Sequence, residues 1–150
     1  MAAPPTPTIR VLKEDDILNG FLNSLDSLSE TSSMGGPEAL AIFNKVRSDP
    51  NHVILVAELA GRVVGTMTML IDQKFIHNGG RVCHIEDVAV SRDVQGMGIG
   101  TLLGRACLDY AAKAGCYKTV LECRRDIIPF YERMGFHVHG TAMRFDHDTV

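Results

Sequence analysis

Residues 95–100 read Gln-Gly-Met-Gly-Ile-Gly, a run of alternating glycines between an apolar stretch and a long amphipathic pattern. Such glycines permit a tight turn in which successive backbone N–H groups point the same way. Apolar residues then recur at three- and four-residue steps from Ile99 to Ala114, which predicts a helix stopped by Gly115. The loop and the helix N-terminus behind it would together favour a phosphate or pyrophosphate, although a ligand-free flexible turn is the alternative interpretation.

Two common phosphate-binding motifs do not fit this loop. No Gly-Lys-Ser/Thr triplet follows it, which excludes a Walker loop, and the glycine spacing is not G-x-G-x-x-G. The loop also lies late in the chain, whereas a dinucleotide-binding loop follows the first strand of its domain. A dinucleotide fold is therefore disfavoured.

Strand and helix patterns alternate along the whole chain, and no linker or internal repeat divides it. Strands are expected at residues 9–12, 53–59, 62–71, 81–90, 118–123 and 136–145, and helices at 17–25, 37–49, 99–114 and 127–134. Residues 29–36 are expected to form a loop, and residues 74–80 a polar link. The pattern predicts an α/β domain over residues 9–150 with a mixed, mostly antiparallel sheet flanked by helices, after a disordered tail at residues 1–8.

Charge and cysteine content restrict the function and the location. A net charge of −3 argues against a general nucleic-acid or membrane-surface binder, but leaves room for a local cationic pocket. No apolar run is long enough to span a bilayer, and the first residues do not read as a signal peptide. The four cysteines form no CxxC pair, which indicates free thiols in a reducing compartment and a cytoplasmic location: Cys83, Cys107, Cys116 and Cys123.

The segment Gln95-x-x-Gly98-x-Gly100 resembles the pyrophosphate-binding loop of the GNAT acetyltransferases. The resemblance extends over residues 9–145 and includes Glu58-x-x-Gly61-x-x-Val64-Gly65 and Phe130-Tyr131-x-x-x-Gly135-Phe136. Within GNAT the chain is most similar to the glucosamine-6-phosphate N-acetyltransferases, on the stretches Lys74-Phe75-Ile76-His77, His84-Ile85-Glu86-Asp87-Val88, and Cys116-Tyr117-Lys118 with Leu121-Glu122-Cys123.

The resemblance implies a GNAT fold whose sheet splays where acetyl-CoA, the co-substrate, enters. It also implies acetyl transfer to glucosamine 6-phosphate on the way to UDP-N-acetylglucosamine, without a metal, by a homodimer in which residues 141–145 cross to the second subunit. The backbone of the splayed strand would contact the pantetheine arm and the glycine loop would hold the pyrophosphate. The implied CoA-binding residues are Val88, Ala89, Val90, Gln95, Gly96, Met97, Gly98, Ile99, Gly100, Thr101 and Tyr131.

Three residues are implied in catalysis. Tyr131 would donate a hydrogen bond or proton to the departing CoA sulfur; a core aromatic is the alternative. Glu86 and the carbonyl of Glu122 would orient the amine and take its proton. Because alternate residues of a strand face opposite ways, Glu86 and Asp87 cannot form a paired-carboxylate dyad, and buried ion pairing is the alternative role for these two acids in an apolar strand.

The implied acceptor-binding residues share polar or cationic character, or neighbour such residues in the motifs. They are Thr31, Lys74, Phe75, Ile76, His77, Glu86, Asp87, Val88, Tyr117, Lys118 and Arg144. Ser29 is an alternative to Thr31, and Arg124 and Arg125 are further cations without support from the family. For any one Lys or Arg, a solvated surface position is the competing interpretation.

Several features leave alternatives open. Ile127 stands where relatives commonly carry an Asn that contacts CoA, so this contact is not expected here. His137 and His139 could share one face of a strand, but no third metal ligand has suitable spacing. Cys123 is interpreted as a packing residue.

Two other functions compete with the one that the resemblance implies. One is acetyl transfer to another amine, such as a peptide N-terminus or a polyamine, which an acidic groove would favour. The other is that of a non-catalytic acyl-CoA-binding module.

Overall fold

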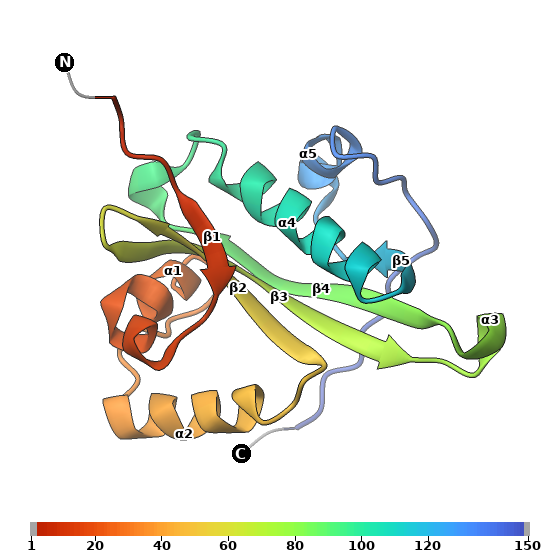
Figure 1. Ribbon diagram of the computed structural model, residues 1–150, viewed down its shortest axis with the longest axis horizontal. Coiled ribbons are helices and arrows are strands. Elements are labelled where there is room, and N and C mark those ends of the chain that lie inside the picture. Colours follow the sequence, from red (N-terminus) through yellow and green to blue (C-terminus); the bar gives the residue numbers. More distant parts are fainter. Residues whose placement is uncertain (1–2, 149–150) are drawn as a thin grey trace.

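The computed structural model describes residues 3–148, so the ends of the predicted tail and domain (residues 1–2 and 149–150) lie outside the described residues. Five strands form one sheet in the order of the sequence (Figure 1). They are β1 (Thr8–Val11), β2 (His52–Leu59), β3 (Arg62–Gln73), β4 (Arg81–Val90) and β5 (Cys116–Val120). The first four pair antiparallel and β5 runs parallel to β4, which confirms the predicted mixed sheet.

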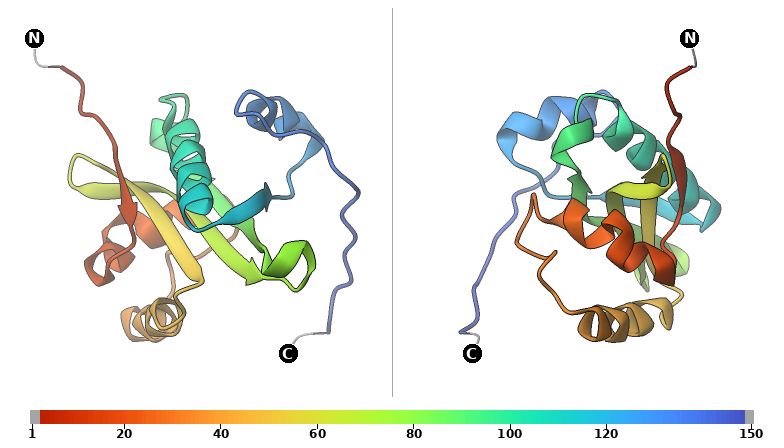
Figure 2. Two further views of the ribbon diagram at one scale, coloured as in Figure 1. Left: turned by 45° about the vertical axis from the view of Figure 1, so that its right-hand side comes forward. Right: turned by 90° about the vertical axis from the view of Figure 1, so that its left-hand side faces the viewer.

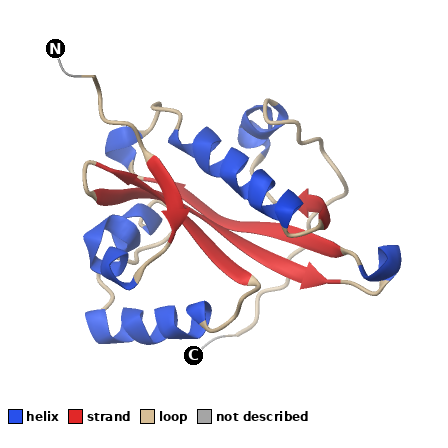
Figure 3. Cartoon of the chain, in the orientation of Figure 1, coloured by secondary structure: helices blue, strands red, loops and turns tan. Residues whose placement is uncertain are grey.

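Helices cover both faces of this sheet (Figure 3). They are α1 (Leu22–Leu25), α2 (Gly36–Arg47), α3 (Ile76–Gly79), α4 (Ile99–Lys113) and α5 (Ile128–Glu132). One core contains α4 residues such as Leu103 and Cys107 packed on β3 and β4, and the other contains Phe21, Phe43 and Val56. Short helical turns precede α1, at Glu14–Asp16 and Ile17–Phe21, and others lie at Arg92–Val94 and Arg125–Ile127.

The hairpin of β2 and β3 forms as predicted. Leu59 pairs with Arg62, so only Ala60 and Gly61 lie between the strands, and both have positive φ, at 50° and 82°. A two-residue turn with two left-handed residues matches the twist of the flanking strands, which explains the glycine at the second position. A bulge at Ala57 and Glu58 then shifts the register by one residue, and the shifted register places Met67 and Met69 opposite Leu55 and Val53 in the core.

The edge of β4 is only partly covered by β5. Pairing runs from Arg81 opposite Cys116 to His84 opposite Val120, and there β5 ends. From Ile85 to Val90, β4 remains paired with β3 on one side, but no strand within residues 3–148 pairs with its other side. The sheet therefore opens between β4 and β5, as a GNAT fold requires.

The last predicted strand, at residues 136–145, is wrong for the single chain. After α5, Phe136 packs on the core, but residues 137–148 form no strand and run as extended chain beside the sheet (Figure 2). Val138, Met143 and Phe145 are 67%, 94% and 81% exposed. The residue pattern suits a strand, but a strand needs a partner, and this segment pairs with no strand of the described chain. Two smaller corrections are that β5 spans Cys116–Val120 rather than 118–123, and that the link 74–80 contains α3.

Candidate active site

The glycine loop presents an open backbone at the start of α4. Gly96 and Gly98 have φ of +86° and +79°, and a Cβ built on either meets no atom within 4 Å. The Gln95 side chain donates to the Val90 carbonyl at 3.1 Å and thereby ties the loop to the end of β4. Gly100 has a different role, because a Cβ at this position would lie 3.1 Å from the Phe130 ring. The absence of a side chain at Gly100 therefore permits α5 to pack closely against the start of α4. An anion could approach this backbone and the N-terminus of α4 without obstruction.

We expect Gly98→Ala to raise the KM for acetyl-CoA by about tenfold or more, because a side chain at this open backbone would displace hydrogen bonds to a charged pyrophosphate. Gly61→Ala is a matched control, since Gly61 also has a positive φ (+82°) and open space around it, but lies in the β2–β3 turn. Both variants should lose about 1–2 kcal/mol of stability from left-handed strain. Equal acetyl-CoA KM values for the two variants would remove the loop from the binding site.

A β-bulge interrupts β4 beside its open edge. Thr66 pairs with Ala89 and Thr68 with Glu86, so Asp87 and Val88 together face one residue of β3. Asp87 has φ +46°, a left-handed conformation that is uncommon for a non-glycine residue. Regular alternation therefore fails at this point, and the expectation that the two acids lie on opposite faces of a regular strand does not hold for Asp87.

Glu86 and Asp87 are both exposed, which corrects the view of two acids held in an apolar strand. Neither takes part in an ion pair within residues 3–148. A structural ion pair therefore does not explain them. Their carboxylates lie on the stretch of β4 whose outer edge is open and are available to a polar ligand.

Tyr131 lies on α5 with 7% of its surface exposed, held by edge-to-face contacts with Phe130 and Phe136 at 4.9 and 5.6 Å between ring centroids. Burial raises the pKa of the Tyr131 hydroxyl, and the nearby Cys123 and Cys107 thiols raise it further. The hydroxyl therefore stays protonated at neutral pH. No side-chain hydrogen bond within residues 3–148 uses it, so it remains a free donor.

The cysteines are all free thiols, as predicted. Burial raises the pKa of Cys83 to about 11 and that of Cys107 to about 12, which makes both unreactive. Cys123 is exposed rather than packed, because β5 ends at Val120 and the chain has left the sheet by then. Glu122 is exposed beside it.

Four predicted acceptor residues meet where the β3–β4 connection lies against β5. The His77 and Tyr117 rings are 4.1 Å apart, and Lys118 Nζ lies 5.6 Å above the Tyr117 ring. Lys74 forms an ion pair with Asp72 at 2.6 Å, which raises the pKa of Lys74. Phe75 and Ile76 are exposed at the tip formed by α3.

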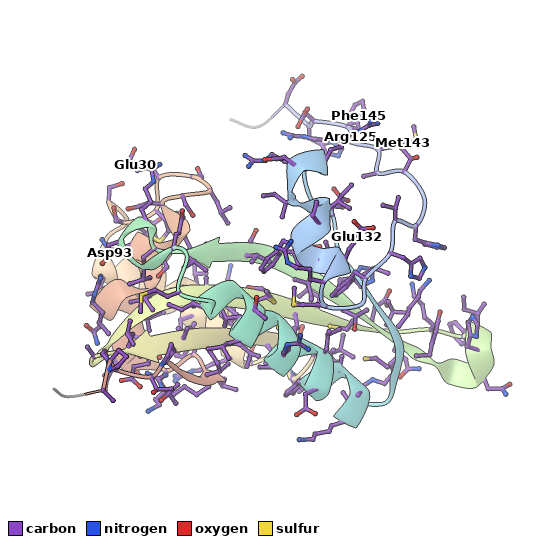
Figure 4. All side chains as sticks on the ribbon, turned by 90° about the horizontal axis from the view of Figure 1, so that it is seen from above. Glu30, Asp93, Arg125, Glu132, Met143 and Phe145 are labelled. Carbon is purple, nitrogen blue, oxygen red and sulfur yellow. The ribbon has the colours of Figure 1, made fainter. Side chains whose placement is uncertain are left out.

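The other predicted phosphate contacts lie far from this group in the single chain. Thr31 belongs to the α1–α2 connection, at the end of the molecule opposite α3 (Figure 1). Arg144 lies in the C-terminal segment, which leaves α5 and runs away from it to the opposite end of the molecule (Figure 2). Met143 and Phe145, the neighbours of Arg144, lie across the molecule from Glu30 of the α1–α2 connection (Figure 4). Arg144 pairs with Asp146 at 2.7 Å, both side chains being exposed. One chain therefore does not gather all the predicted phosphate contacts.

Neither Tyr131 nor a residue of the glycine loop lines either of two cavities in the described chain. One of about 430 Å³ lies between the end of α1 and residues 91–93, and one of about 220 Å³ lies between α2 and the β1–β2 edge.

The rings of His137 and His139 are 6.3 Å apart, and residues 3–148 hold no group of three potential metal ligands. None of the helices in this range has the length and apolarity needed to cross a membrane.

The open β4 edge, the glycine loop at a helix N-terminus and the buried tyrosine are the features expected of an acyl-CoA-type transferase site. Residues 21–136 match the acetyltransferase (GNAT) family. The chain belongs to this family and is an acyltransferase. GNAT enzymes use acetyl-CoA.

Several of its relatives are named glucosamine 6-phosphate N-acetyltransferase. The glucosamine 6-phosphate N-acetyltransferase of Trypanosoma brucei brucei is 34% identical over 92% of this chain and 94% of its own. The enzyme of the same name from Candida albicans is 31% identical over 95% and 97%. The crystal structure of glucosamine-6-phosphate N-acetyltransferase from Arabidopsis thaliana superposes with a TM-score of 0.90 at 33% identity, covering 95% of this chain and 99% of that one.

Proposed function

We propose that the protein transfers the acetyl group of acetyl-CoA to the 2-amino group of glucosamine 6-phosphate, giving N-acetylglucosamine 6-phosphate and CoA, a step toward UDP-N-acetylglucosamine. The observation that carries the proposal is the open edge of β4, which leads to the glycine loop at the start of α4. The free hydroxyl of Tyr131 comes from α5, whose Phe130 packs against Gly100 of that loop. Relatives of nearly the same length, named for this activity, support the choice of acceptor.

The proposed reaction is direct attack of the amine on the thioester carbonyl. The N–H groups of the bulged stretch near Val88 polarise the carbonyl oxygen as the C–N bond forms. Glu86 and the Glu122 carbonyl orient the amine, and its proton leaves toward Glu86, directly or through water. The C–S bond then breaks, and the hydroxyl of Tyr131 donates to the thiolate. No covalent enzyme intermediate is required.

The proposed active unit is a homodimer. The C-terminal segment supports this, because its exposed Val138, Met143 and Phe145 resemble a strand that lacks its partner. Pairing with a second copy would bury these side chains and carry Arg144 to the acceptor site of that copy. The separation of Thr31, Lys118 and Arg144 within one chain supports a site assembled from two chains.

Four free thiols favour a cytoplasmic location.

The function is tested by measuring CoA release with a panel of amines: glucosamine 6-phosphate, glucosamine, a polyamine and a peptide with a free N-terminus. We expect glucosamine 6-phosphate to have the highest kcat/KM, and glucosamine to lose at least about tenfold, because it lacks the charge-assisted phosphate contacts. Preference for the polyamine or peptide would assign a different GNAT acceptor. Binding of acetyl-CoA without turnover of any amine would identify a non-catalytic module.

A further inference from the structure

The connection between α1 and α2, residues 26–35, is held mainly by hydrogen bonds. Most of its side chains are exposed, including Leu28, and Met34 is the first that packs partly against the core. On the inner side, Asp26 lines the cavity of about 430 Å³ together with Ser27, Ser91 and Arg92. Because most side chains of the loop are exposed and few pack against the core, the conformation of the loop depends on the polar contacts that it makes.

One carboxylate supplies the main contacts. Oδ1 of Asp26 accepts hydrogen bonds from the backbone N–H groups of Thr31 and Ser32, both at 2.8 Å. Bonds from the Ser32 side chain and from these two backbone groups hold the pKa of Asp26 below its usual range. The carboxylate is therefore ionised at neutral pH, and its bonds to the loop are lost only as the pH falls through that lowered pKa.

The start of this loop is anchored to the end of β4. Ser24 is fully buried, donates to the Gly20 carbonyl at 2.9 Å, and lies 3.3 Å from the hydroxyl of Ser91. Ser91 directly follows β4, and its N–H donates to the Val64 carbonyl at 2.7 Å. Polar contacts thus lead from the end of β4 through Ser91 and Ser24 to α1, and Asp26, two residues further on, continues them to Thr31.

We propose that Asp26 is a positioning residue of the acceptor site, which holds the Thr31 segment in a fixed place relative to the acetyl-transfer edge of β4. The inference rests on the proposed function and on the acceptor-binding role that the resemblance implies for Thr31, taken here as a contact with the phosphate of the amino sugar. Asp26 itself does not contact the substrate. Its negative charge near a phosphate would be unfavourable unless it were engaged, and here backbone donors engage it.

The kinetic test compares Asp26→Ala, Asp26→Asn, Thr31→Val and the double variant Asp26→Ala/Thr31→Val. Asp26→Ala should raise the KM for glucosamine 6-phosphate by about tenfold and leave the acetyl-CoA KM unchanged. Asp26→Asn retains an acceptor oxygen and should recover most of this loss. The double variant should be no worse than Thr31→Val, because Asp26 acts through Thr31. Additive losses, or an unchanged acceptor KM in Asp26→Ala, would overturn the proposal.

A second measurement is independent of the acceptor. The amide protons of Thr31 and Ser32 should exchange with solvent faster in Asp26→Ala than in wild type, and nearly as slowly as wild type in Asp26→Asn. Asp49→Ala is the matched control: it removes a similar carboxylate bond, to the Asn51 N–H at 2.9 Å, in the turn before β2. Unchanged exchange in Asp26→Ala contradicts the inference. Failure of wild-type protein to acetylate glucosamine 6-phosphate contradicts instead the proposed function.

Discussion

Tyr131→Phe is expected to lower kcat by about ten- to a thousandfold, the range for loss of general-acid assistance. The thiolate develops charge only as the C–S bond breaks, so the hydroxyl helps the transition state more than the bound substrates. Both KM values should therefore change little. Because burial raises the pKa of Tyr131 above its ordinary 10.0, the donor remains protonated across the neutral and moderately alkaline range.

Stability gives this experiment a clear control. The ring contacts of Tyr131 with Phe130 and Phe136 do not involve the hydroxyl, and no hydrogen bond within residues 3–148 is lost with it, so the variant should unfold at the wild-type temperature. Tyr110→Phe removes a hydroxyl from α4, distant from the glycine loop in the sequence, and should retain full activity. A Tyr131→Phe variant with wild-type kcat would show that the tyrosine only packs.

Arg144→Ala is expected to weaken binding of glucosamine 6-phosphate by about ten- to a hundredfold, equivalent to one charge-assisted hydrogen bond of roughly 1.5–3 kcal/mol. The ion pair that Arg144 forms with Asp146 is exposed on both sides and contributes little to stability, so the fold should be unaffected. Acetyl-CoA affinity should remain unchanged. Arg105→Ala, which removes an exposed arginine of α4, is the control.

Mixing Arg144→Ala with Tyr131→Phe tests whether Arg144 acts in the neighbouring subunit. If the site is shared, a mixed dimer has one site with both defects and one with neither. At equal concentrations half of the dimers are mixed, so activity should recover to about a quarter of wild type. Absence of recovery, with subunit exchange demonstrated by mass spectrometry, would place Arg144 in the site of its own chain or outside any site.

The elements that could be predicted are those encoded by neighbouring residues. The β2–β3 turn follows from Ala60-Gly61 between two β-branched runs, and α4 follows from its apolar spacing between Gly98 and Gly115. The glycine loop is also predictable, because its signal lies in the neighbouring residues 95–100. Its geometry adds one distinction that spacing could not supply: Gly98 is required by its positive φ, but Gly100 by the ring of Phe130.

The features that could not be predicted depend on contacts distant in sequence. The bulge at Asp87 arises from pairing with β3, and no local signal marks a non-glycine residue for positive φ. Residues 136–145 have a strand pattern, but the pattern does not reveal whether a partner exists in the same chain. Asp26 was missed because its partners, Thr31 and Ser32, follow five and six residues later. An Asp shortly before a run of Ser and Thr is the only available signal.

The open edge of β4 also has a consequence for handling the protein. From Ile85 to Val90 its outer N–H and C=O groups lack strand partners within the described chain, and such an edge can pair with another molecule and begin aggregation. The exposed charges of Glu86 and Asp87, together with the bulge, oppose this, as charges and bulges do on natural edge strands. A ligand seated along the edge would protect it further, and acetyl-CoA or CoA should therefore slow precipitation during concentration and storage as well as raise Tm.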